Sequence, residues 1–97
     1  KSRHDASMSE ETYLAAVRLR IRKARQATQM LQEEVAEKVD LTHRHYQRYE
    51  AITHPKFAVS LLTLRRIAQA LAVPISELTR EANEDELKEL GLEDTRF

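Results

Sequence analysis

The sequence predicts an all-α fold, a compact bundle of five helices followed by a short C-terminal helical extension. Only one glycine and two prolines occur among the 97 residues, too few for the many turns of a β-sandwich or barrel of this length. Good helix formers dominate the composition, and apolar residues recur at helical spacing along most of the chain. A hydrophobic content of 41% is typical of a globular domain rather than a disordered chain.

The first helix is predicted over residues 10–26, after a disordered polar tail formed by residues 1–9. Ser9 can accept hydrogen bonds from first-turn N–H groups, and the carboxylates of Glu10 and Glu11 face the positive end of the helix dipole. Apolar residues then recur at helical spacing, and the arginines between them are expected on other faces of the helix. The apolar residues are Leu14, Val17, Ile21 and Ala24, and the arginines are Arg18, Arg22 and Arg25.

A short second helix is predicted within the segment LQEEVAEKV, and a three-residue turn separates it from a third helix over about residues 42–51. Asp40 enters the left-handed backbone region more easily than most residues other than glycine, and Thr42 offers an N-cap oxygen. Helical spacing then divides the third helix into an inner face and a polar, basic outer face. The inner face holds Tyr46, Tyr49 and Glu50, and the outer face holds Arg44, Gln47 and Arg48, with His43 at its edge.

Two further helices complete the predicted bundle, and a third forms the C-terminal extension. Ser60 caps a helix over about residues 61–72, and Pro74 marks its end. A fifth helix begins at Ile75. A last short amphipathic helix ends at Gly91, because glycine readily adopts the left-handed conformation that follows many helices.

The formal net charge is zero, but the charges are unevenly distributed along the chain. Residues 13–76 carry eleven Lys and Arg against five Asp and Glu, whereas residues 77–97 carry three against eight. The basic part can therefore approach a polyanion such as a nucleic acid. We accordingly divide the chain after its tail into a folded domain of residues 10–79 and an acidic extension of residues 80–97.

Several classes of protein and site are excluded by the composition. Because the chain has no cysteine, it has no disulfide framework, thiol nucleophile or cysteine-based zinc site. Its apolar runs are too short for a membrane span or a signal peptide, so we expect a cytoplasmic protein without a membrane partner. His43 and His45 diverge by about 200° around a helix and cannot share a metal ion. His54 and Glu50 are close to these two histidines in the sequence and would complete the nearest candidate for a catalytic cluster. We nevertheless predict no metal, no cofactor and no catalysis.

Two segments resemble the helix-turn-helix domain of phage Cro and repressor proteins, on which many bacterial regulators are built. The segment QEEVAEKVDLTHRHYQRYE, from Gln32 to Glu50, is similar to the family's pattern of helix, turn and recognition helix. The segment LRRIAQALAVPISEL, from Leu64 to Leu78, is similar to its closing helix pair. Two ordered matches separated by a loop are more specific than either alone. The resemblance covers about residues 17–79 and implies a bacterial or phage regulator, in the first instance a repressor, that binds double-stranded DNA.

The resemblance also implies roles for individual residues. Arginine can fork to guanine and glutamine to adenine, so the outer face of the recognition helix is expected to read bases in the major groove. Side chains at helix starts and in the following loop are expected to hold phosphates. The base-contacting residues are His43, Arg44, Gln47 and Arg48, and the phosphate-contacting residues are Gln32, Thr42 and Lys56. Arg25 is expected to pair with Glu50, because a carboxylate on an inner face is unfavourable without a partner.

The chain departs from the family pattern at two positions that shape the helix-turn-helix. Leu31 replaces the usual serine or threonine before Gln32, so Thr28 or Gln29 is expected to cap the second helix instead. Asp40 replaces the glycine of the turn.

A single module of this size touches only a few base pairs, and the family generally binds as a two-fold dimer. We expect a homodimer formed through the C-terminal region, whose acidic balance DNA would repel. Its apolar residues, which are expected at the surface, are Leu78, Leu87, Leu90, Leu92 and Phe97. The operator would be an inverted repeat with the recognition helices about 34 Å apart. The alternative is an antitoxin or an adaptor that uses the same fold to bind a protein partner.

Overall fold

The structure is a computed structural model that describes residues 9–53 and 58–91. All regular secondary structure in these two ranges is helical, as predicted. The helices are α1 (Glu10–Thr28), α2 (Gln32–Lys38), α3 (His43–Glu50), α4 (Leu61–Ala70), α5 (Ile75–Thr79) and α6 (Glu84–Glu89).

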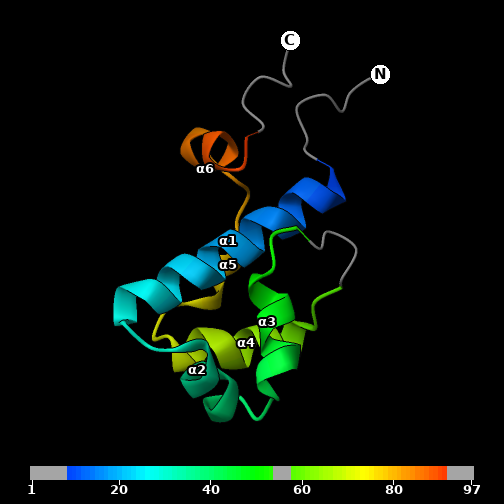
Figure 1. Ribbon diagram of the computed structural model, residues 1–97. Coiled ribbons are helices and arrows are strands. Elements are labelled where there is room, and N and C mark those ends of the chain that lie inside the picture. The colour runs from blue at the N-terminus through cyan, green and yellow to red at the C-terminus, as the bar shows by residue number, and fades with distance from the viewer. Residues whose placement is uncertain (1–8, 54–57, 92–97) are drawn as a thin grey trace.

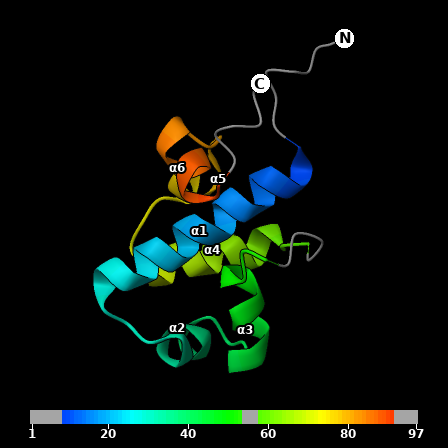
Figure 2. The same ribbon diagram turned by 45° about the horizontal axis from the view of Figure 1, so that its top comes forward.

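Helix α1 crosses the middle of the molecule and separates α2 and α3 from α6 (Figure 1). It packs against α3 and α5, while α4 packs against α2 and α5. A view turned by 45° shows the same order, with α6 on the opposite side of α1 from α2 and α3 (Figure 2). The helix-turn-helix and the last helix therefore lie at opposite ends of the described structure.

The core is formed by apolar side chains from α1 to α5. Its fully buried members include Ile21, Tyr46, Ile67 and Leu78. The burial of Leu78, which is 0% exposed, corrects the prediction that this leucine lies at the surface. Because Leu78 faces the core, α5 completes the bundle.

Helix α1 is buried all around its central turns, from Ala15 to Ile21. Arg18, predicted on a face other than that of the apolar residues, has no exposed surface, and burial lowers the pKa of its guanidinium. Because α1 has neighbours on several sides, arginine positions between the apolar ones also become buried.

Side-chain hydrogen bonds begin three of the helices at the residues that the sequence predicts. Ser9, Thr42 and Ser60 accept hydrogen bonds from the N–H groups of Thr12, His45 and Thr63. Helix α2 differs from the prediction, because neither Thr28 nor Gln29 caps it. The Glu34 carboxylate accepts the Leu31 N–H at 2.7 Å, whereas the Thr28 hydroxyl donates to a carbonyl of α1. Helix α2 thus begins with only one half of a capping box, the one that the acidic residue in its first turn supplies.

Left-handed backbone conformations follow four of the helices, at Gln29, Asp40, Ala72 and Gly91. Asp40 has a φ of 62°, as predicted for the position where the family has glycine, and it turns the chain from α2 towards α3. Ala72 has a φ of 60°, so α4 ends at Ala70 rather than at residue 72. Gly91, with a φ of 78°, follows α6 as predicted.

Helix α6 is held to the rest of the protein by ion pairs. The Glu86 carboxylate accepts two hydrogen bonds from Arg20 at 2.9 and 3.0 Å and two from Arg80, both at 3.0 Å. Arg20 also donates to the Leu78 carbonyl at 2.9 Å. Three helices thus meet at the Arg20 side chain, which is only 5% exposed.

Two of the remaining apolar residues of the C-terminal region are partly buried. Leu87 on α6 and Leu90, the C-cap residue of α6, are half-buried, and Leu92 and Phe97 lie outside the described residues. In the part of the chain that the structure describes, no helix is long and apolar enough to cross a membrane.

Candidate nucleic-acid interface

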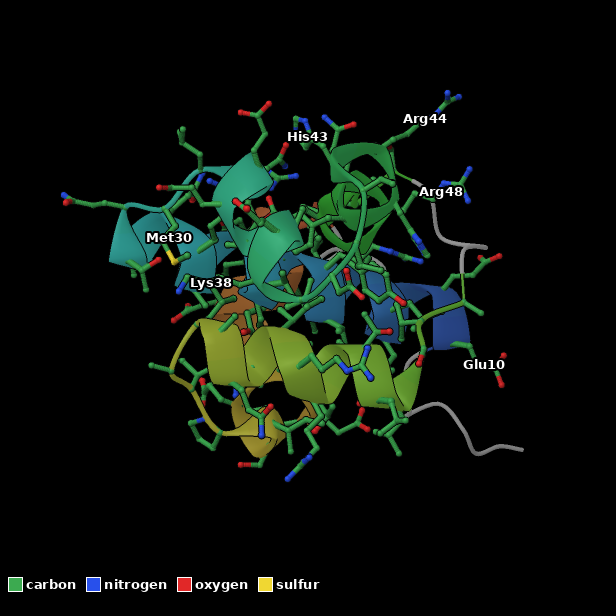
Figure 3. The ribbon with its side chains drawn as sticks, turned by 90° about the horizontal axis from the view of Figure 1, so that it is seen from below. Glu10, Met30, Lys38, His43, Arg44 and Arg48 are labelled. Atoms are coloured by element: carbon green, nitrogen blue, oxygen red, sulfur yellow. The ribbon has the colours of Figure 1, made fainter. Side chains whose placement is uncertain are left out.

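Helix α3 exposes one polar face and buries the other. Tyr46, Tyr49 and Glu50 are at most 3% exposed, and they anchor the helix on α1 and α2. The opposite face consists of exposed side chains, namely His43, Arg44, Gln47 and Arg48. Arg44 and Arg48 point away from the body of the protein (Figure 3). The helix thus presents hydrogen-bond donors on a rigid, well-anchored support.

The position of α3 depends on its N-terminus and on the turn before it. The Thr42 hydroxyl accepts the His45 N–H at 3.1 Å, and the Leu41 N–H donates to the Ala36 carbonyl at 2.9 Å across the turn. Ala36 is 2% exposed at the helix crossing, where a larger side chain would separate α2 from α3. These contacts set the start of α3 beside the start of α2.

Behind the exposed face, four hydrogen bonds converge on the Glu50 carboxylate. Arg25 donates from Nε to Oε2 at 2.6 Å and from Nη2 to Oε1 at 3.0 Å. The Gln32 amide donates to Oε1 at 3.0 Å, and the Tyr46 hydroxyl donates to Oε2 at 2.5 Å. Arg25 and Glu50, predicted as a pair, therefore lie together, and the Glu50 side chain is 2% exposed.

These hydrogen bonds determine the charge state of the buried groups. Burial alone raises the pKa of Glu50, but the hydrogen bonds from Arg25, Tyr46 and Gln32 outweigh it and leave the pKa below its usual value. Burial and the neighbouring carboxylate raise the pKa of Tyr46. The hydrogen bond to Glu50 raises the pKa of Arg25. Glu50 is therefore ionised, and Tyr46 stays a donor at neutral pH.

Gln32 connects this buried cluster with the exposed face of α3. Its amide nitrogen is directed inwards to Glu50, and its carbonyl oxygen lies 3.3 Å from His43 Nε2 and 3.5 Å from Gln47 Nε2. His43 Nδ1 also lies 3.7 Å from a carboxylate oxygen of Glu33. Two of the residues predicted to contact bases thus meet one residue predicted to contact a phosphate.

Several of these contacts were not predicted from the sequence. Tyr46 was expected in the core, but its hydroxyl also donates to Glu50, four residues later. Spacing of i, i+4 on one helix face was the available signal. The position of Glu33 beside His43 was not predicted either. Lys56, predicted to contact a phosphate, lies outside the described residues, as does His54.

The described residues contain no group of three or more histidine, aspartate or glutamate side chains arranged to hold a metal ion. The buried pair of Arg25 and Glu50 joins α1 to α3, and Gln32 joins α2 to the same carboxylate. What remains exposed on α3 is a set of hydrogen-bond donors and acceptors, which suits recognition of a polar surface.

Comparison with known proteins identifies the family. The helix-turn-helix family model matches residues 21–78, which is more than half of the chain. The match extends from the second half of α1 to α5 and includes the turn between α2 and α3. No curated protein and no solved structure matches the chain significantly. The chain therefore belongs to the helix-turn-helix family of DNA-binding regulators.

Proposed function

We propose that this protein is a transcriptional repressor that binds a specific double-stranded DNA sequence with α3 in the major groove. The observation that carries the proposal is the division of α3 between an anchored inner face and an outer face of Arg44, Gln47 and their neighbours. A helix of this kind fits the major groove, where each base pair presents a distinct pattern of donors and acceptors.

In this proposal the interface residues divide into two groups. The base-contacting residues are His43, Arg44, Gln47 and Arg48, all exposed on α3. Thr42 and Gln32 stand at the starts of α3 and α2, where N–H groups and the helix dipole favour a phosphate. Gln32 retains a second amide hydrogen for this contact besides the one donated to Glu50. We also assign a phosphate contact to Lys56.

We expect Arg44→Ala or Gln47→Ala to weaken binding to the preferred site by about 1–3 kcal/mol, because each removes direct contacts to a base edge. The preferred sequence is first selected from a random pool of duplexes. Affinity is then measured on that site, on single-base variants and on unrelated DNA. Each substitution should relax the preference at one position of the site.

The matched control for Arg44→Ala is Lys88→Ala, which also removes one exposed positive charge. Lys88 lies on α6, at the other end of the molecule (Figure 1). The substitution Lys88→Ala should therefore leave the sequence preference for DNA unchanged. A double variant, Arg44→Ala with Gln47→Ala, that keeps the full preference of the parent would show that α3 does not read bases.

We further propose that two copies bind an inverted repeat through contacts of the C-terminal region. Helix α6 is remote from α3 (Figure 2), and Leu87 on this helix and Leu90 at its C-cap are half-buried. Its first turn is acidic, with Glu84, Asp85 and Glu86, which DNA phosphates would repel. A two-fold contact there would set the recognition helices one turn of DNA apart, about 34 Å.

For this assembly we expect the full chain to sediment as a dimer at tens of micromolar and a Leu87→Ser, Leu90→Ser variant as a monomer, because the variant loses the apolar contact. The control is Leu61→Ser with Leu62→Ser on α4, which changes two leucines that are 70% and 63% exposed and should remain dimeric. Truncation after Thr79 is a poorer test, since it removes Glu86 from the buried Arg20. A monomeric parent, or a dimeric α6 variant, would refute the proposed interface.

A further inference from the structure

The hydroxyl of Tyr46 occupies an unusual place for a core aromatic residue. The ring is 0% exposed, and its hydroxyl donates to Glu50 Oε2 at 2.5 Å. Packing alone would be served by phenylalanine, which has the same shape without the hydroxyl. The hydroxyl therefore adds a specific hydrogen bond to the ion pair between Arg25 and Glu50.

This hydrogen bond completes the set of donors around the Glu50 carboxylate. Oε2 accepts from Arg25 Nε and Tyr46, and Oε1 accepts from Arg25 Nη2 and Gln32 Nε2. Two donors on each oxygen fix both the position and the plane of the carboxylate. The loss of the hydroxyl leaves Oε2 with one of these donors, and the carboxylate is then less constrained.

The orientation of the carboxylate matters at the surface because Gln32 is attached to it. The Gln32 amide is held at 3.0 Å from Glu50, whereas its carbonyl oxygen lies 3.3 Å from His43 and 3.5 Å from Gln47. The two outer contacts are long and weak, so they depend on the shorter inner contact to hold the side chain in place. Gln32 can orient two exposed side chains of α3 only while Glu50 orients Gln32.

We propose that Tyr46 is a positioning residue for DNA sequence recognition, acting through Glu50 and Gln32 on His43 and Gln47. This inference rests on the proposed function, in which these two exposed residues contact bases. Tyr46 contributes to specificity because pre-oriented side chains lose less conformational entropy when they bind a base edge. Contacts to phosphates by other residues do not depend on this orientation.

The test compares Tyr46→Phe with Tyr49→Phe, two identical changes on the buried face of α3. The Tyr49 hydroxyl accepts the Ser60 N–H at 3.3 Å at the far end of the helix, so its loss serves as the control. We measure affinity for the selected site and for a scrambled duplex at a temperature where all variants are folded. Tyr46→Phe should lower the ratio of specific to non-specific affinity by about 3- to 10-fold, and Tyr49→Phe should not change it.

A double-mutant cycle with Gln32→Ala tests the route through Gln32. If Tyr46 acts through Gln32, adding Tyr46→Phe to Gln32→Ala produces no further fall in the ratio. An additive fall, an unchanged ratio for Tyr46→Phe, or an equal loss on both duplexes would overturn the inference. A parent protein that does not distinguish the two duplexes would instead refute the proposed function itself.

A measurement on the unmodified protein keeps the inference testable should Tyr46→Phe not fold. In an NMR spectrum of the free protein, the side-chain amide of Gln32 should exchange with water more slowly than that of the exposed Gln69, because one of its hydrogens is bound to Glu50. Equal exchange of the two amides would show that Gln32 is not held, and the route from Tyr46 to the surface would not exist.

Discussion

Replacing Glu50 with alanine is expected to lower the free energy of unfolding by about 3–5 kcal/mol. The Glu50 side chain is 2% exposed and that of Arg25 14% exposed, so the substitution leaves a largely buried guanidinium without its carboxylate. It also removes the acceptor for the Tyr46 hydroxyl and the Gln32 amide. Urea or thermal unfolding of the variant and the parent at pH 7 measures the difference.

The control for this prediction is Glu37→Ala, which removes an exposed carboxylate from α2. Its effect should stay within about 0.5 kcal/mol. If Glu50→Ala melts within a degree or two of the parent, the ion pair contributes nothing measurable and the argument from burial is wrong.

The hydrogen bonds around Glu50 also determine how stable the protein is when the ion pair is replaced by apolar residues. Exchanging only Arg25 and Glu50 for methionine and leucine would leave the Tyr46 hydroxyl buried without its acceptor, which costs about 1–3 kcal/mol. Adding Tyr46→Phe removes that unsatisfied hydroxyl. The triple variant should therefore be more stable than the double variant, although it contains one substitution more.

Replacing Glu86 with glutamine is expected to have the second largest effect on stability, about 3 kcal/mol at pH 7. Burial raises the pKa of this carboxyl, but hydrogen bonds from Arg20, Arg80 and the Asn83 backbone have a larger effect in the opposite direction. The pKa is therefore lowered from its ordinary value of 4.5 to about 2. The Glu86 side chain is 12% exposed, so solvent screens these interactions only partly. Its partner Arg20 becomes a buried charge without a counterion.

The lowered pKa of Glu86 also predicts how this contribution depends on pH. A carboxyl whose pKa is lower in the folded than in the unfolded state stabilises the fold above the unfolded value of 4.5. The contribution is then lost as the pH falls towards about 2. The difference in unfolding free energy between the parent and Glu86→Gln should therefore be constant above about pH 5 and shrink below it.

Glu84→Gln is the matched control, since it makes the same substitution at an exposed position in the first turn of α6. Its difference from the parent should be much smaller at pH 7. The unfolding free energies of Glu86→Gln and the parent are compared at pH 7 and at pH 2. If their difference is the same at both pH values, the ion pairs of α6 do not stabilise the folded state.

Most helix starts and turns could be predicted because they depend on hydrogen bonds between residues close in sequence. Thr42 bonds to the N–H three residues later, and Asp40 adopts the left-handed conformation within the turn itself. The capping box of Asn83 and Glu86 at the start of α6 was not predicted, although its hydrogen bonds are equally local. Such features require no knowledge of the tertiary fold.

Within the candidate site, spacing predicted which face of α3 is exposed, and the family resemblance indicated the pairing of Arg25 with Glu50. Neither could indicate that Gln32 and Tyr46 share the same carboxylate. That arrangement depends on how closely α1, α2 and α3 approach one another. A hydrogen bond requires partners within a few tenths of an ångström, a precision that helical periodicity does not provide.

The sequence by itself therefore determined the helical class, the helix-turn-helix and the polar face of α3, because each follows from periodicity, caps and turn residues. Only the tertiary structure decided that Arg18 and Arg20 are buried, that Leu78 is in the core and that Glu86 joins α6 to α1. Arg20 and Glu86 are separated by 66 residues. Charged side chains are usually exposed on a helix, and only the neighbours that the fold brings around α1 make these arginines exceptions.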